Sequence, residues 1–201
     1  MGGTMTAESV EHRRRHWPVP PVDGYTVDDL FTLPDLPPHT ELIDGSLVFV
    51  SPQREFHTLA MDVLVYGLRS IAPPELSIRR EMTVVIDRRN GPEPDVVVLR
   101  KEATGIDRTR YTAADILLAV EVVSPDSESR DRTTKPQKYA AAGIPNFWRV
   151  EQGGTSGSPV IHVYELDPLT HAYVHMGMHR DRIKVDKPYA IDIDLNAIDE
   201  I

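Results

Sequence analysis

An acidic residue stands inside an apolar segment of this chain. Glu121 interrupts the run Ile116–Val123, in which all the remaining residues are apolar. A short apolar run bounded by polar segments predicts a buried strand. Moving an isolated carboxylate into such a strand costs on the order of several kcal/mol unless a cation meets it. The sequence therefore predicts that the fold brings a metal ion or a basic side chain to Glu121.

The hydrophobic pattern predicts a mixed sheet with helices. An Asp-Gly pair at 44–45 favours a hairpin within residues 41–50. Apolar residues spaced near 3.6 predict an amphipathic helix over residues 57–71. Pro136 and Gly143 suit the first turn and the C′ position of a second helix. Strands are predicted at residues 76–78, 82–86, 95–99, 116–123, 147–150 and 160–166. Strands interleaved with helices in this way indicate the α/β class.

Length and composition predict one domain preceded by an arm. With 201 residues, 40% of them hydrophobic, the chain supports one substantial core. Residues 1–24 contain three consecutive arginines and several prolines without periodicity, which favours a mobile arm before a domain at residues 25–201. The sequence has no cysteine, no secretory signal and no apolar run of membrane length. We therefore expect a soluble, cytoplasmic protein without a membrane partner.

The formal net charge of −9 counts against a nucleic-acid partner, because duplex binding normally rests on phosphate contacts from Lys and Arg. It does not exclude one, because metal-binding carboxylates raise the acidic count at their own site. Several arginines close in sequence to the apolar strands could form a local positive rim. They are Arg79, Arg80, Arg88, Arg89, Arg108, Arg110, Arg130 and Arg132. For any single arginine, a solvated surface charge is the more common situation.

A second carboxylate is a candidate partner for Glu121. The period of a strand places Glu121 on the same face as Leu117 and Ala119. Asp95, at the start of its own apolar strand, faces Glu121 if the two strands are neighbours. Magnesium binds oxygen ligands, typically two carboxylates with waters and substrate oxygens. Asp95, Glu121 and the carbonyl of Val122 are therefore candidate ligands for Mg²⁺ or Mn²⁺, and such a site with a lysine nearby can activate water against a phosphodiester.

A longer set of residues resembles a known family. The set is Glu41, Pro94-Asp95, Glu121 to Pro125, Asp131, Lys135, Tyr139, Gly143 to Pro145 and Phe147-Trp148. In this order they resemble the Uma family, described as restriction endonucleases, over about residues 25 to 200. That family resembles a branch of the PD-(D/E)XK nuclease superfamily. The resemblance implies a restriction-endonuclease-like mixed β-sheet flanked by helices.

The chain departs from the superfamily pattern at one position. The usual Glu-X-Lys would put lysine at position 123, where this chain has valine. The resemblance implies that a lysine from the following helix takes its place, and the spacing favours Lys135. Lys138 is the alternative. Lys135 is four residues from Tyr139 and shares its helix face, whereas Lys138 is next to Tyr139 in the sequence and lies on another side of the helix. The implied role of Lys135 is to orient the nucleophilic water or to stabilise charge developing on the phosphate.

The resemblance also draws attention to Glu41 and His57. Glu41 matches an acidic position that often completes the metal site in the superfamily, although without the resemblance a surface charge on an edge strand is the simpler interpretation. His57 matches a histidine near the start of the family's first long helix, a place that also suits a local hydrogen-bonding residue. Tyr139 and Trp148 are interpreted as core aromatics.

These observations predict an endonuclease that hydrolyses DNA with Mg²⁺ or Mn²⁺, with Asp95, Glu121, Lys135 and Glu41 as catalytic residues. A two-fold homodimer would suit cutting both strands of a duplex, an inference from symmetry alone. One alternative is a catalytically inactive nuclease-like fold that serves as a binding or regulatory module. Another is a structural α/β protein in which Glu121 forms a buried ion pair with Lys135 or an arginine.

Overall fold

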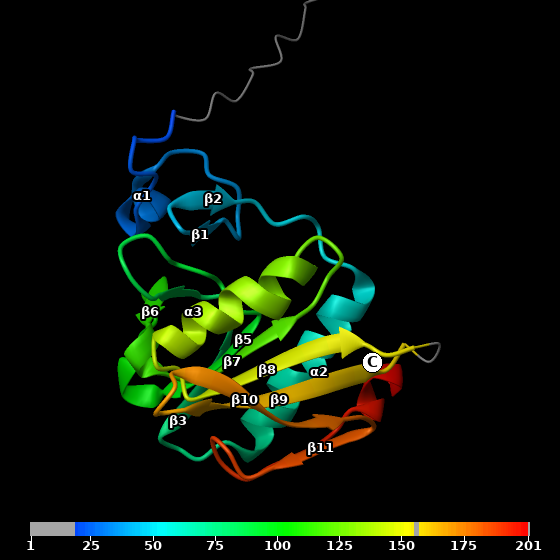
Figure 1. Cartoon of the computed structure of the whole chain (residues 1–201). Coiled ribbons are helices and arrows are strands. Elements are labelled where there is room, and N and C mark those ends of the chain that lie inside the picture. Colours follow the sequence, from blue (N-terminus) through cyan, green and yellow to red (C-terminus); the bar gives the residue numbers. More distant parts are fainter. Residues whose placement is uncertain (1–18, 155–156, 201) are drawn as a thin grey trace, which may run out of the picture.

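The computed structural model describes residues 19–154 and 157–200, and its main feature is a six-stranded sheet (Figure 1). Its strands are β3 (Leu76–Arg80), β5 (Val96–Arg100), β7 (Ile116–Val122), β8 (Asn146–Gln152), β9 (Pro159–Asp167) and β10 (Ala172–His179). The spatial order is β10-β9-β8-β7-β5-β3. All neighbouring strands are antiparallel except β7 and β8, which are parallel. The predicted mixed sheet is confirmed.

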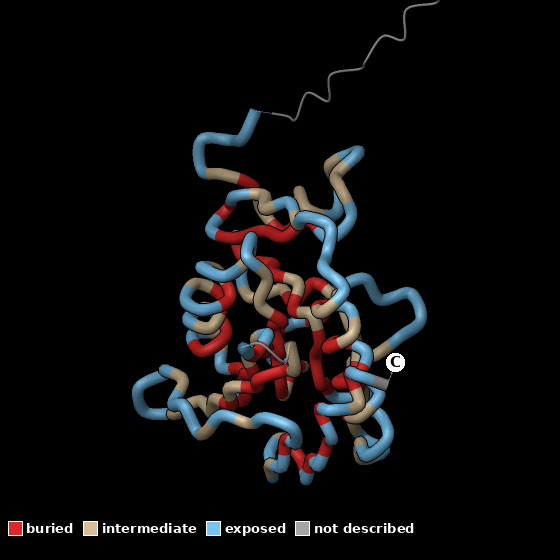
Figure 2. The backbone as a smooth tube through the Cα atoms, turned by 90° about the vertical axis from the view of Figure 1, so that its right-hand side faces the viewer, coloured by how far each residue is buried: buried red, intermediate tan, exposed pale blue. Residues whose placement is uncertain are grey.

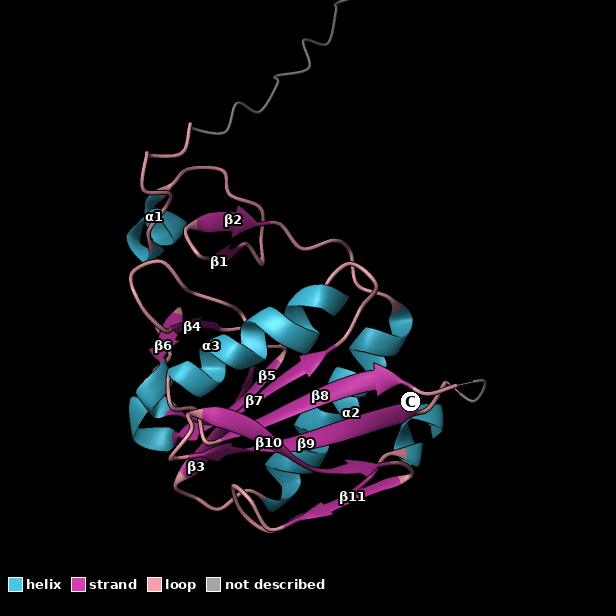
Figure 3. Ribbon diagram, in the orientation of Figure 1, coloured by secondary structure: helices cyan, strands magenta, loops and turns pink. Residues whose placement is uncertain are grey.

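Helices and short paired strands complete the described part of the chain. The helices are α1 (Val27–Thr32), α2 (Glu55–Ile71) and α3 (Lys135–Ala141), and α3 continues from a π-helical turn, η3 (Arg130–Thr134). Single-turn 3₁₀ segments are η1 (Lys101–Ala103), η2 (Ala113–Asp115) and η4 (Asn196–Glu200). The paired strands are β1 (Glu41–Ile43) with β2 (Ser46–Val48), β4 (Thr83–Val85) with β6 (Arg110–Thr112), and β11 (Arg182–Val185) with β12 (Ile191–Asp194). Figure 3 shows helices on both sides of the sheet.

Local sequence signals explain several element ends. Asp44 and Gly45 have φ angles of 51° and 77°, the left-handed conformation that a two-residue hairpin turn requires, so the predicted hairpin is confirmed as β1–β2. Gly143, with φ of 80°, follows the last turn of α3 as predicted. The first turn of α1 is held by a capping box between Thr26 and Asp29.

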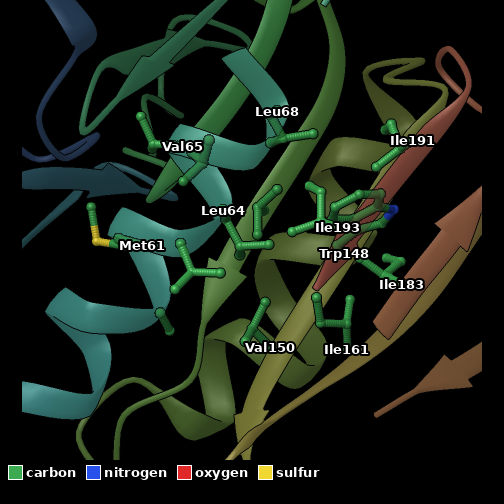
Figure 4. Packing of buried hydrophobic residues seen from close by; sticks show 14 of the residues in the cluster. Met61, Leu64, Val65, Leu68, Trp148, Val150, Ile161, Ile183, Ile191 and Ile193 are labelled. Atoms are coloured by element: carbon green, nitrogen blue, oxygen red, sulfur yellow. The ribbon is translucent and has the colours of Figure 1, made fainter. Parts of the chain in front are cut away.

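Two hydrophobic clusters cover the two faces of the sheet. On one face α2 packs against the strands, and the β11–β12 hairpin adds to the same cluster (Figure 4). Labelled members of this cluster are Met61, Leu64, Val65, Leu68, Trp148, Val150, Ile161, Ile183, Ile191 and Ile193. On the other face, Tyr139 of α3 packs against Phe147 of β8 with ring centroids 6.0 Å apart. Figure 2 shows the buried residues in the interior and exposed loops around them.

The strand β7 lies at the centre of this arrangement. It pairs with β5 on one edge and β8 on the other, and all its residues except Leu117 are buried. Val96 pairs with Val120 in the antiparallel β5–β7 register, so Asp95 comes opposite Glu121. The condition under which Asp95 was predicted to face Glu121, that their strands are neighbours, is met.

Other predictions concern the ends of the chain and the long connections. The predicted arm at residues 1–24 falls mostly outside the described residues, which begin at residue 19. The single domain at residues 25–201 stays a prediction. The connection between β5 and β7 includes the short strand β6, which pairs in parallel with β4. In the described part of the chain, no helix has the length and apolar character needed to cross a membrane.

Candidate functional site

A cavity of about 360 Å³ lies where β7 ends and β5 begins. Its walls come from β1, the start of α2, the residues before β5, the end of β7 and the η3–α3 segment. The carboxylates that line it are Glu41, Glu81, Glu93, Asp95, Glu121, Asp126 and Asp131. The fold thus gathers acidic side chains from segments far apart in the sequence.

Lys135 is the buried cation of this cavity. Its Nζ lies 2.8 Å from Oε1 of Glu41, 3.0 Å from Oε2 of Glu121 and 3.3 Å from Oδ1 of Asp131. Asp131 precedes it by four residues, in the π-helical turn that leads into α3. Lys138, the sequence alternative, is directed elsewhere and pairs with the exposed Asp44 at 2.6 Å. The structure therefore brings Lys135, and not Lys138, to Glu121.

Glu121 is held by two donors from α3. Its Oε2 accepts a hydrogen bond from Lys135, and its Oε1 accepts one from the hydroxyl of Tyr139 at 2.5 Å. Burial raises the pKa of Tyr139 well above its usual range, so the phenol keeps its proton and donates it. Tyr139 is a core aromatic as predicted, but it is also a polar partner of Glu121.

Asp95 is fixed by contacts on both of its oxygens. Oδ2 accepts the backbone N–H of Val122 at 2.6 Å, and Oδ1 lies 3.0 Å from Nε2 of His57 in the first turn of α2. Burial lowers the pKa of His57, but the hydrogen bond and charge of Asp95 outweigh it and the net shift is upward. Because Asp95 contacts the residue next to Glu121, the two carboxylates approach the cavity from adjacent strands.

Glu41 reaches the same cluster from β1. Its Oε1 accepts the backbone N–H of Glu93 at 2.8 Å and also contacts Lys135. Glu41 is buried, so the interpretation of this residue as a surface charge is wrong. Glu93 in turn lies 2.5 Å from His39 on the cavity wall. The hydrogen bond that His39 donates to Glu93 raises the pKa of His39, whereas burial raises the pKa of Glu93.

Negative charge exceeds positive charge inside the cavity. Burial raises the pKa of both Glu121 and Asp131, and Lys135 opposes the shift in each case. Burial would lower the pKa of Lys135, but the surrounding carboxylates outweigh it and raise the pKa well above its usual range. Lys135 therefore stays charged. Its single ammonium group has three carboxylates as direct partners, and Asp95 is a fourth carboxylate in the same cavity.

The donor set has the chemistry that a hard divalent cation requires. The side chains of Asp95 and Glu121 offer carboxylate oxygens, and the buried Oδ1 of Asp131 forms an ion pair with Lys135 at 3.3 Å. Among the described residues, no three His, Asp or Glu side chains are grouped closely enough to hold an ion by themselves. Magnesium does not need such a cage, because it commonly takes one or two carboxylates together with waters and substrate phosphates. Asp95 and Glu121 fit that requirement.

The Tyr139 hydrogen bond gives a direct stability prediction. Tyr139→Phe should lower the free energy of unfolding by about 1.5–3 kcal/mol, because it removes a donor to a buried charged group. Tyr173→Phe is the matched control, because its hydroxyl donates to the neutral carbonyl of Ile144 at 2.8 Å and its ring also stacks on Phe147. The control should lose about 0.5–1.5 kcal/mol. Equal losses in urea unfolding would contradict a charged Glu121 acceptor.

The sequence located some of these residues and missed others. Asp95, Glu121, Lys135 and Glu41 are brought together, and Val122 supplies a backbone contact to Asp95. Asp131 belongs to the sequence pattern and precedes Lys135 by four residues, but its direct contact with the ammonium group was not predicted. The expected positive rim is largely not formed at this cavity. Of the arginines proposed for it, only Arg130 lines the cavity in the described structure.

Comparisons with known proteins agree on a nuclease-like fold. The Uma2 family model, described as "Putative restriction endonuclease", matches residues 27–194. A solved structure from Anabaena variabilis, described as "a putative nuclease belonging to DUF820", is similar with a TM-score of 0.62 at 16% sequence identity. The match covers 81% of this chain and 89% of that chain. At this identity the likeness shows the fold alone. No curated protein matches the chain.

Proposed function

Because this chain belongs to the Uma2 family, described as "Putative restriction endonuclease", we propose that it is a metal-dependent endonuclease that hydrolyses phosphodiester bonds of DNA. The observation that carries the proposal is the meeting of Asp95 and Glu121 in one cavity with a buried lysine. Two carboxylates and an ammonium provide the ligands for a divalent ion and a positive group near the reacting phosphate.

Asp95, Glu121 and the carbonyl of Val122 would hold Mg²⁺ or Mn²⁺. In an extended strand the N–H and C=O of one residue face the same edge. The N–H of Val122 donates a hydrogen bond to Asp95. This supports placing the carbonyl oxygen of Val122 at the same edge of β7 as Asp95. A bound divalent ion would lower the pKa of a water and neutralise charge on the phosphate.

The remaining groups act on the substrate or position the ligands. We assign Lys135 to orient the attacking water or to stabilise charge developing on the phosphate oxygens. Glu41 assists by holding Lys135 from β1, and Asp131 holds it from the preceding turn. Tyr139 restrains one oxygen of Glu121, and His57 restrains one oxygen of Asp95.

Three further proposals accompany this function. Residues 25–201 form one nuclease domain. A two-fold homodimer would present two such cavities to the two strands of a duplex. A chain without cysteine is compatible with the reducing cytoplasm, where we place it.

A plasmid assay tests the function directly. Supercoiled DNA incubated with the purified chain and Mg²⁺ or Mn²⁺ should become nicked and then linear, and EDTA should abolish the conversion. Magnesium or manganese added back in excess should restore it. Cutting that persists in EDTA, or no cutting with either metal at any protein concentration, would contradict a metal-dependent nuclease.

A second candidate function is a nuclease-like fold that serves as a binding or regulatory module. The observation that favours it is the position of Lys135, which supplies an internal cation to three carboxylates. Calorimetric titration with Mn²⁺ separates the two functions. The enzyme should bind the ion in a way that Asp95→Asn weakens, whereas the module should show no such binding.

A further inference from the structure

Two arginines of the cavity have no hydrogen-bond or ion-pair partner among the described residues. Most arginines in the described structure donate to a carboxylate, a backbone carbonyl or a sulfur. The described arginines whose side chains make neither a hydrogen bond nor an ion pair are Arg54, Arg88, Arg108 and Arg130. Arg54 and Arg130 line the cavity that contains Asp95 and Glu121. The other two line a separate cavity beside α1.

Arg130 is the more constrained of the pair. Its Nε is buried and has no hydrogen-bond acceptor in the described structure. Asp131 is its direct neighbour in sequence, yet it pairs with Lys135 and not with Arg130. A buried guanidinium nitrogen beside an acid-rich cavity would ordinarily take one of those carboxylates. Its free donor indicates that an acceptor comes from outside the protein.

Arg54 connects this cavity to a second one. It is the N-cap residue of α2, and its carbonyl accepts the N–H of His57 at 2.9 Å, which fixes its backbone next to the histidine that contacts Asp95. An adjoining cavity of about 220 Å³ is also lined by Arg54, His57, Ser124 and Pro125. The two cavities share these four residues, so they lie next to each other on the molecule.

We propose that Arg130 and Arg54 bind successive phosphates of a nucleic-acid strand that passes along these two adjoining cavities. Arg130 holds the phosphate presented to Asp95 and Glu121, and Arg54 holds the next one. The guanidinium fork matches phosphate oxygens in pairs and keeps its charge at every physiological pH. The inference rests on the proposed nuclease function, and it explains how an acidic chain offers cations where the substrate passes.

The salt dependence of DNA binding tests the assignment. Affinity for a fluorescein-labelled duplex is measured by anisotropy in Ca²⁺ at several salt concentrations, and a gel verifies that the duplex stays intact. Loss of one phosphate contact reduces the slope of log K against log salt by about 0.7–0.9. Arg130→Ala and Arg54→Ala should each show this reduction. Arg130→Lys should keep the slope and bind more weakly, because it keeps the charge without the fork.

Arg182→Ala is the matched control. Arg182 of β11 is paired with Asp192 and lines neither of the two cavities. Its removal should leave the slope unchanged, and thermal melting should show that all variants fold. The proposal is overturned if Arg130→Ala keeps the wild-type slope, or if the wild-type chain does not bind the duplex.

Plasmid cleavage measured on the same preparations separates the two proposals. If the wild type cuts DNA while Arg130→Ala keeps its salt slope, only the arginine assignment fails. If binding depends on Arg130 but no cutting occurs with Mg²⁺ or Mn²⁺, the nuclease proposal fails and the phosphate site stands.

Discussion

Replacing Lys135 by alanine is expected to lower the free energy of unfolding by about 3–5 kcal/mol at neutral pH, because it leaves buried charges without a partner. Lys135 contacts Glu41, Glu121 and Asp131, all of them buried, and it is buried itself. The alanine side chain has neither a charge nor a hydrogen-bond donor for these carboxylates, and solvent reaches the buried site poorly. Urea unfolding followed by tryptophan fluorescence measures the loss.

Lys138→Ala is the control on the same helix. Lys138 pairs with an Asp44 whose side chain is 66% exposed, so the pair is screened by solvent. Its loss should change the free energy of unfolding by only about 0–1 kcal/mol. Equal effects of the two substitutions would show that Lys135 does not offset the buried carboxylates.

The pH dependence of the Lys135→Ala variant has a definite sign. Burial raises the pKa of Glu121 and Asp131 above their usual values of 4.5 and 3.8, and Lys135 opposes that shift. Without Lys135 the folded chain holds these protons to higher pH than the unfolded chain does. Its stability therefore falls as the pH rises through and above those values. The deficit relative to wild type should shrink when the pH is lowered from neutrality into the acid range.

The second large effect is expected on catalysis. Asp95→Asn should reduce the initial rate of plasmid nicking by about 10²–10⁴-fold, because a metal ion supplies several kcal/mol of charge stabilisation and each 1.4 kcal/mol is a factor of ten. Asparagine keeps an oxygen that can accept the N–H of Val122, so the β5–β7 connection is retained. The free energy of unfolding without metal should change little, because one like charge leaves the cluster while His57 loses a charged partner.

Asp126→Asn provides the comparison for that rate. Asp126 lines the same cavity, but it is exposed and makes no hydrogen bond or ion pair within the described structure. Its substitution should leave nicking close to the wild-type rate. If Asp95→Asn and Asp126→Asn cut as fast as wild type, the cutting comes from another protein in the preparation.

The sequence was informative wherever local spacing decides geometry. Strand periodicity put Glu121 in a buried position, and the four-residue spacing of Lys135 and Tyr139 put both on one helix face. The structure has both side chains on Glu121. Asp95 could be placed opposite Glu121 only on the condition that the strands are neighbours, because pairing between strands is not a local property.

Contacts between residues that are distant in the sequence could not be predicted from local patterns. Glu41 was expected at the site only because of the family resemblance, and its contact with Lys135 spans 94 positions of the chain. Whether an arginine is free depends on its neighbours in space: Arg80 is paired with Asp62, whereas Arg130 has no acceptor. The β6 strand was not predicted because its three residues are too few to give a periodic signal.

The parallel pairing of β7 with β8 limits how the segment between them can vary. The chain leaves β7 at Val122 and must cross one face of the sheet before β8 can start, and that crossover carries Lys135. Each residue of an α-helix turns the next by about 100°. A single-residue insertion before Lys135 would therefore rotate its side chain away from Glu121 unless the π-helical turn absorbed it. The wide turn of η3 is such a place, so a one-residue change absorbed there should leave Lys135 directed at Glu121 and the strands in register.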